Sequence, residues 1–247
     1  MLTKTFLTAG IALAAFSFSA FGTVYNGNGN TGFGGAIGMG SMTLTDNGTN
    51  LFGTITKGPS GFNDVLVLYI DSITGGFANC SGFADNGDGL RRAISGFDGG
   101  ANRSLMTFIS GFSPDYAIAL GPSSDNFGGL WQLSNGGANS LTFLNSVNLS
   151  PTGNNNSPTY TFSLNLSDLG LTPGAGQSFE IFGTYISNGG YRSDETLIGN
   201  DTGTQGWNPF TQTAFSTYTT TTVPEPSTLA LMMLSGLTTL FAVRQRK

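Results

Sequence analysis

The chain has 247 residues, a formal net charge of −5 and only 9% charged residues, whereas glycine alone fills 38 positions. Residues 23–223 hold five basic and thirteen acidic side chains, a net charge of −8, which argues against nucleic acid or an anionic membrane surface as a partner. The chain has no histidine and one cysteine, Cys80, which excludes a Ser-His-Asp triad, a histidine zinc site and an intrachain disulfide bond.

The N-terminus carries the pattern of a secretory signal peptide. Lys4 is its one charge, residues 6–18 are an apolar stretch, and Ala20 and Gly22 place small side chains at the −3 and −1 positions of a cleavage site. We therefore predict a signal peptide at residues 1–22, the alternative being an uncleaved transmembrane anchor. Residues 23–40 are rich in glycine and asparagine, and we predict a flexible lead-in there.

Short apolar runs separated by turn residues follow. The candidate strands are residues 41–45, 51–56, 63–71, 105–109, 116–120, 130–133, 141–143, 160–166 and 179–186. Asp46-Asn47-Gly48 is typical of a hairpin turn, and the run Val65–Ile70 predicts a central strand buried on both faces. We predict an all-β fold, a β-sandwich or jelly roll of about ten strands over residues 41–210, flanked by an N-terminal signal helix and a C-terminal membrane-sorting helix.

Four short motifs give the middle domain a resemblance to known modules. Asp64–Asp71, Gly75-Gly76-Phe77, Gly111–Tyr116 and Asp168-Leu169-Gly170 are similar to motifs of the DOMON-like and family 9 carbohydrate-binding modules, over about residues 41–200. The resemblance implies a β-sandwich that works at the cell surface. The chain lacks the histidines that would mark a haem-binding member.

Two sets of side chains are candidates for a site in this domain. Asp85, Asn86 and Asp88 cluster oxygen atoms as calcium loops do, but their spacing departs from the EF-hand pattern, so we expect an ordinary turn with calcium as the alternative and no other cofactor. Trp131 and Trp207 are candidates for stacking on sugar rings, the alternative being a place in the core or at its edge. Trp207 is expected to be the more exposed because its neighbours are glycine, asparagine and proline.

The charged residues indicate binding rather than catalysis. Arg91, Arg92 and Arg103 lie close in sequence to acidic residues and are expected to form local ion pairs, the alternative being contact with a polyanionic sugar. No two carboxylates stand out as a glycosidase pair, so we do not expect an enzyme.

The C-terminus carries the most specific motif in the chain. A Thr-rich stretch, 211–222, is predicted to be a stalk; it is followed by Val223-Pro224-Glu225-Pro226, the apolar run Leu229–Val243 and a basic tail. Residues 223–247 closely resemble the PEP-CTERM sorting domain. The resemblance implies recognition of Pro224–Pro226 by an exosortase and transient anchoring of residues 229–243 in the inner membrane of a Gram-negative bacterium. The alternative is an ordinary C-terminal anchor with a proline-containing stalk.

The sequence therefore predicts an exported protein of the cell surface or extracellular matrix. The expected role is structural or adhesive, within exopolysaccharide or biofilm, and the alternative is a carbohydrate-binding module at the cell surface. A glycan binder should show a groove or flat patch with exposed aromatic rings beside polar groups, which a matrix protein does not need.

Overall fold

The computed structural model describes residues 22–134 and 140–223. Residues 1–21 of the predicted signal peptide, the sorting residues Pro224–Pro226 and the predicted membrane helix Leu229–Val243 lie outside these ranges. Within the described ranges, no helix is long and apolar enough to cross a membrane.

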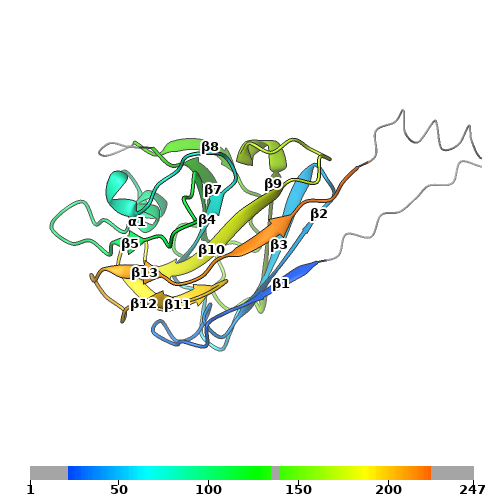
Figure 1. Cartoon of the computed structure of the whole chain (residues 1–247). Helices are drawn as coiled ribbons and strands as arrows, with labels where there is room; N and C mark the ends of the chain where they lie inside the picture. Colours follow the sequence, from blue (N-terminus) through cyan, green and yellow to red (C-terminus); the bar gives the residue numbers. More distant parts are fainter. Residues whose placement is uncertain (1–21, 135–139, 224–247) are drawn as a thin grey trace, which may run out of the picture.

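The described chain is built from strands in three sheets, which confirms the predicted all-β class (Figure 1). Sheet A has the order β1-β2-β3-β9, with bounds Thr23–Asn26, Ser41–Asp46, Asn50–Thr56 and Thr159–Asn165. Sheet B has the order β11-β10-β4-β6-β7-β8, with bounds Arg192–Leu197, Ser178–Ile186, Val65–Asp71, Tyr116–Gly121, Phe127–Gln132 and Thr142–Ser146, and β14 (Ser216–Thr219) also pairs with β10. Sheet C has the order β12-β13-β5, with bounds Asp201–Thr202, Phe210–Gln212 and Met106–Thr107.

Sheets A and B pack face to face, because both are apolar on their inner sides. Strand β3 alternates between buried and exposed residues, so that Leu51 and Ile55 enter the core while Phe52 stays 40% exposed on the outer face. The core between the sheets also takes Leu66 and Leu68 from β4. This two-layer packing is the β-sandwich that the alternating pattern predicts.

The second face of sheet B is covered by a layer that the sequence did not predict. The chain between β4 and β6 holds the short helices η1 (Cys80–Gly82) and α1 (Gly89–Ser95) and strand β5. Val65, Val67 and Tyr69 of β4 pack there in a core with Ile94 of α1. The predicted burial of β4 on both faces is therefore confirmed, with sheet A on one side and α1 with its flanking loops on the other.

The predicted flexible lead-in, residues 23–40, is instead part of the folded domain. Strand β1 pairs antiparallel with β2, and the loop that follows is tied to β11. The carboxylate of Glu195 is fully buried and accepts four backbone N–H groups from this loop, those of Phe33, Gly35, Ile37 and Gly38, at 2.7–3.0 Å. The glycines are read correctly as turn residues, but the partner that orders them lies about 160 positions away and leaves no local signal in the sequence.

The predicted stalk, residues 211–222, is also part of the fold. It contributes most of β13 and the whole of β14, and Tyr218 is buried with its hydroxyl donating to Asp46 Oδ2 at 2.8 Å. Asp46 also accepts the backbone N–H of Thr221. Alternating threonines are strand formers, so composition alone could not separate a stalk from an edge strand.

The two ends of the described chain lie on the same side of the molecule. Gly22 is next to Thr43 and Thr45 of β2, and the C-terminal segment is bound to Asp46 at the end of that strand. In Figure 1, the start of β1 and the end of the described chain after β14 lie at the right of the molecule, whereas α1 and β8 lie farther left.

Candidate functional site

An aromatic patch lies at the β8 edge of sheet B. Phe127 and Trp131 are four residues apart on β7 and so share one face of the strand, and Phe143 of β8 is the cross-strand partner of Trp131. The ring centroids of Trp131 and Phe143 are 5.5 Å apart at an interplanar angle of 66°, and those of Phe127 and Phe143 are 6.3 Å apart. Phe127 and Phe143 are 37% and 44% exposed, whereas Trp131 is 2% exposed and forms the floor.

Two local features bring these rings together. Gly129 lies between Phe127 and Trp131, and a Cβ there would be 2.6 Å from the Trp131 ring, so only glycine lets the indole lie across the strand. The β7–β8 register shifts by one residue between Leu130↔Asn145 and Trp131↔Phe143, which makes Leu144 the extra residue of a bulge. Without that bulge Phe143 would point to the opposite face, because side chains alternate along a strand.

The start of α1 supplies the polar side of the patch. Asp88 caps the helix, its Oδ1 accepting the Arg91 N–H at 2.8 Å, and its Oδ2 accepts from Arg91 Nε at 3.0 Å. Asp85 is fully buried, and its Oδ2 accepts from Arg91 Nη1 at 2.5 Å and from the Leu141 N–H at 2.9 Å. The Asp85 carboxylate thus joins α1 to the residue that precedes β8.

These groups enclose a hollow of about 470 Å³, here named the aromatic hollow. It is lined by Asp88, Leu90, Arg91, Asp125, Phe127, Trp131 and Phe143. Asp125, in the β6–β7 turn, accepts from the Ser124 hydroxyl at 2.6 Å and lies close to Gly89 at the start of α1. The indole Nε1 of Trp131 is buried and has no hydrogen-bond partner among the described residues.

A second hollow, of about 260 Å³, is polar and lies between β8 and sheet A. Its lining consists of Asn50, Asn145, Ser146, Asn148, Ser163, Leu164, Asn165 and Asp168. The amides of Asn145 and Asn165 donate to Asp168 at 3.2 and 3.3 Å, so much of its hydrogen-bonding capacity is already used within the site. It lacks the aromatic rings that a sugar face would stack on.

The sequence candidates for a metal site lie beside the aromatic hollow but have other partners. Asp85 and Asp88 are both bound by Arg91, and the backbone carbonyl of Asn86 accepts from Arg92. Over the described ranges, no group of three or more acidic, cysteine or histidine side chains could hold a metal ion. The geometry of the loop that holds Asp85, Asn86 and Asp88 resembles the expected ordinary turn. Calcium binding stays an untested alternative.

The three arginines behave largely as structural groups. Arg91 forms the expected ion pairs, and Arg92 donates to the Asn188 carbonyl at 2.9 Å. Arg103 donates to the carbonyls of Cys80 and Phe83. The predicted ion pairs are therefore confirmed for Arg91, whereas Arg92 and Arg103 form none with the described residues and contact carbonyl oxygens instead. Contact with a polyanionic sugar stays an untested alternative.

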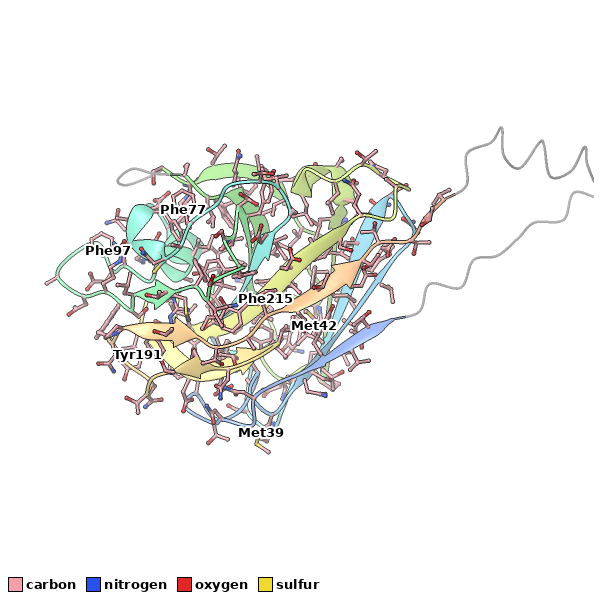
Figure 2. The ribbon with its side chains drawn as sticks, in the orientation of Figure 1. Met39, Met42, Phe77, Phe97, Tyr191 and Phe215 are labelled. Carbon is pink, nitrogen blue, oxygen red and sulfur yellow. The ribbon has the colours of Figure 1, made fainter. Side chains whose placement is uncertain are left out.

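The two tryptophans lie at opposite edges of sheet B. Trp131 is on β7 next to the edge strand β8, whereas Trp207 packs edge to face on Tyr191, beside β11, at 5.6 Å. Tyr191, which Figure 2 labels near β12 and β13, in turn stacks on Phe33 at 6.0 Å. Trp207 is half-buried, as expected from its turn, whereas Trp131 is buried and lines the hollow described above.

Sheet C holds a buried carboxylate, that of Asp201, with a raised pKa. Burial raises the pKa of Asp201 to about 7, a shift that nearby Arg192 opposes and Asp194 reinforces. The protonated form is thus favoured in the folded state, and the stability it contributes is fully present below about pH 4 and lost as the pH rises through 7.

Asp201→Asn is expected to remove most of this pH dependence. The free energy of unfolding of the unmodified chain should fall by roughly 2–4 kcal/mol more than that of the variant between pH 4 and pH 8. Urea unfolding at pH 4, 5.5, 7 and 8 measures the difference. Parallel pH profiles for the two proteins would show that ionisation of Asp201 does not lower the free energy of unfolding.

Comparison with known families identifies a protein-sorting motif in the C-terminal segment. Residues 222–247 match the model of the PEP-CTERM protein-sorting motif, a range that includes Val223, Pro224, Glu225 and Pro226. The chain thus carries the sorting motif of an exported protein that an exosortase targets and that is anchored transiently in a membrane before processing. No match was found among curated proteins or among solved structures, so the resemblance to DOMON-like and family 9 modules stays a prediction.

Proposed function

We propose that this chain is an exosortase-processed protein of the cell surface or extracellular matrix of a Gram-negative bacterium, and that its β-sandwich adheres to exopolysaccharide in the biofilm by binding glycan in the aromatic hollow. The observation that carries the proposal is the hollow itself. Two half-exposed phenylalanine rings lie beside carboxylates over a buried tryptophan, which is the combination expected of a carbohydrate-binding surface.

The position of the hollow suits this role. Sorting signals act at the membrane, and both would leave the domain beside the end of β2, whereas the aromatic hollow is next to β8. Figure 1 places these two regions on different sides of the molecule. A domain held near the membrane during processing would keep its binding surface accessible to extracellular polymer.

We also propose that the domain binds glycan without cleaving it. Asp88 is committed to the α1 cap and to Arg91, which leaves Asp125 as the one lining carboxylate without an ion pair among the described residues. Glycoside hydrolysis ordinarily needs two carboxyl groups free to act as an acid and as a base or nucleophile. Release of shorter sugars from a bound glycan would contradict this part of the proposal.

Phe143→Ala is expected to weaken glycan binding by about tenfold, because it removes a half-exposed stacking ring from the edge strand β8. The full chain, purified in detergent, is applied to an array of bacterial polysaccharides and binding is quantified by equilibrium titration. Phe52→Ala is the matched control, since Phe52 is 40% exposed but lies on the outer face of sheet A. Equal losses in the two variants, or no glycan bound by the unmodified chain, would overturn the proposal.

A further inference from the structure

We infer that the ligand of the aromatic hollow is a glycan with free amino groups, such as a polymer of glucosamine whose amines are protonated. This inference rests on the proposed glycan binding and adds the chemical class of the sugar. It follows from the charge of the lining and from the way in which its one cation is used.

The lining has two carboxylates, Asp88 and Asp125, against the single guanidinium of Arg91. Arg91 is neutralised inside the domain, because its Nη1 donates to Asp85 and to the Leu141 carbonyl, and its Nε donates to Asp88. Asp125 accepts from a serine hydroxyl and forms no ion pair with any residue of the described ranges. The hollow therefore presents net negative charge to a ligand.

The net charge of the surrounding domain is negative as well. Residues 23–223 carry a net charge of −8, so uronic acid or sulfated polymers would be repelled during approach and again within the hollow. A protonated amine on a sugar ring would be attracted to Asp125 and Asp88. The same ammonium group would lie within reach of the electron-rich faces of Phe127 and Phe143, which favours cations.

The test compares three hexasaccharides on the full chain in detergent by isothermal titration: glucosamine, N-acetylglucosamine and galacturonic acid oligomers. The glucosamine oligomer is expected to bind about tenfold more tightly than its N-acetylated form, as a charge-assisted contact implies, with the preference shrinking at high salt. The galacturonic acid oligomer is expected to bind most weakly.

The double variant Asp88→Asn/Asp125→Asn should bind the glucosamine and N-acetylglucosamine oligomers equally. Asparagine still caps α1, and an unchanged melting temperature would confirm that the variant is folded. Glu180→Gln is the control and should keep the preference. It removes a carboxylate from β10, which is separated from β8 by the three strands β4, β6 and β7. If none of the three oligomers binds while a polysaccharide of the array does, only this inference is overturned; if the array also shows no binding, the glycan-binding proposal fails and this inference with it. If the N-acetylated oligomer binds as tightly as the free amine, or the preference survives in the double variant, only this inference is overturned.

Discussion

Glu195→Ala is expected to lower the free energy of unfolding by about 3–5 kcal/mol. The carboxylate is fully buried and accepts four backbone N–H groups of the loop between β1 and β2. Alanine would leave all four donors without their acceptor, and the three from Gly35, Ile37 and Gly38 are buried. The loop also covers part of the main core through Ala36 and Ile37, so loosening it would expose apolar surface as well.

Urea unfolding of the full chain measures this loss, with Glu180→Ala as the matched control. Glu180 is a glutamate on a neighbouring strand, but it is only half-buried and should cost less than about 1 kcal/mol. Glu195→Gln should fall between the two, since it keeps one oxygen acceptor and loses the other. A loss for Glu195→Ala no larger than the control would mean that the loop does not depend on this carboxylate.

Asp85→Ala is expected to cost about 2–4 kcal/mol of stability, because it leaves Arg91 with the half-exposed Asp88 as its remaining ion-pair partner and removes the acceptor of a buried backbone N–H. Asp85 also accepts the Leu141 N–H, the contact that fixes the chain just before β8. The variant should therefore lose glycan binding together with stability, since Phe143 is positioned by that strand.

Asp88→Asn is the control for this prediction, because it involves the same arginine. Asp88 is half-exposed and asparagine preserves the helix cap, so its ion pair with Arg91 should be worth less than about 1 kcal/mol. Thermal and urea unfolding of both variants separate the two contributions. Equal losses would show that burial of Asp85 does not make its pairing with Arg91 more costly to break.

The fold was predictable where the signal is local. The uninterrupted apolar run of β4 indicated a strand covered on both sides, and Asp46-Asn47-Gly48 indicated the β2–β3 hairpin. The sequence was misleading where order comes from a distant partner: the glycines and asparagines of the lead-in look flexible until the Glu195 carboxylate is placed among them.

The binding surface was predictable only in part. Trp131 was singled out as a stacking candidate, but Phe127, Phe143 and Asp125 were not. Phe143 reaches the face of Trp131 only through the bulge at Leu144, and its exposure follows from β8 being the edge of sheet B. Register and edge position depend on strand pairing, which a single sequence does not reveal.

The most direct test of the proposed function is to measure where the protein resides in its own host. Cells that make the unmodified chain, Phe143→Ala or Phe52→Ala are separated into membrane, polysaccharide-matrix and medium fractions, and the protein in each is quantified. We expect the unmodified chain and Phe52→Ala to be retained in the matrix, and Phe143→Ala to be released into the medium in similar total amount. Retention of Phe143→Ala in the matrix, or an unmodified chain that stays in the membrane, would contradict adhesion to exopolysaccharide through the aromatic hollow.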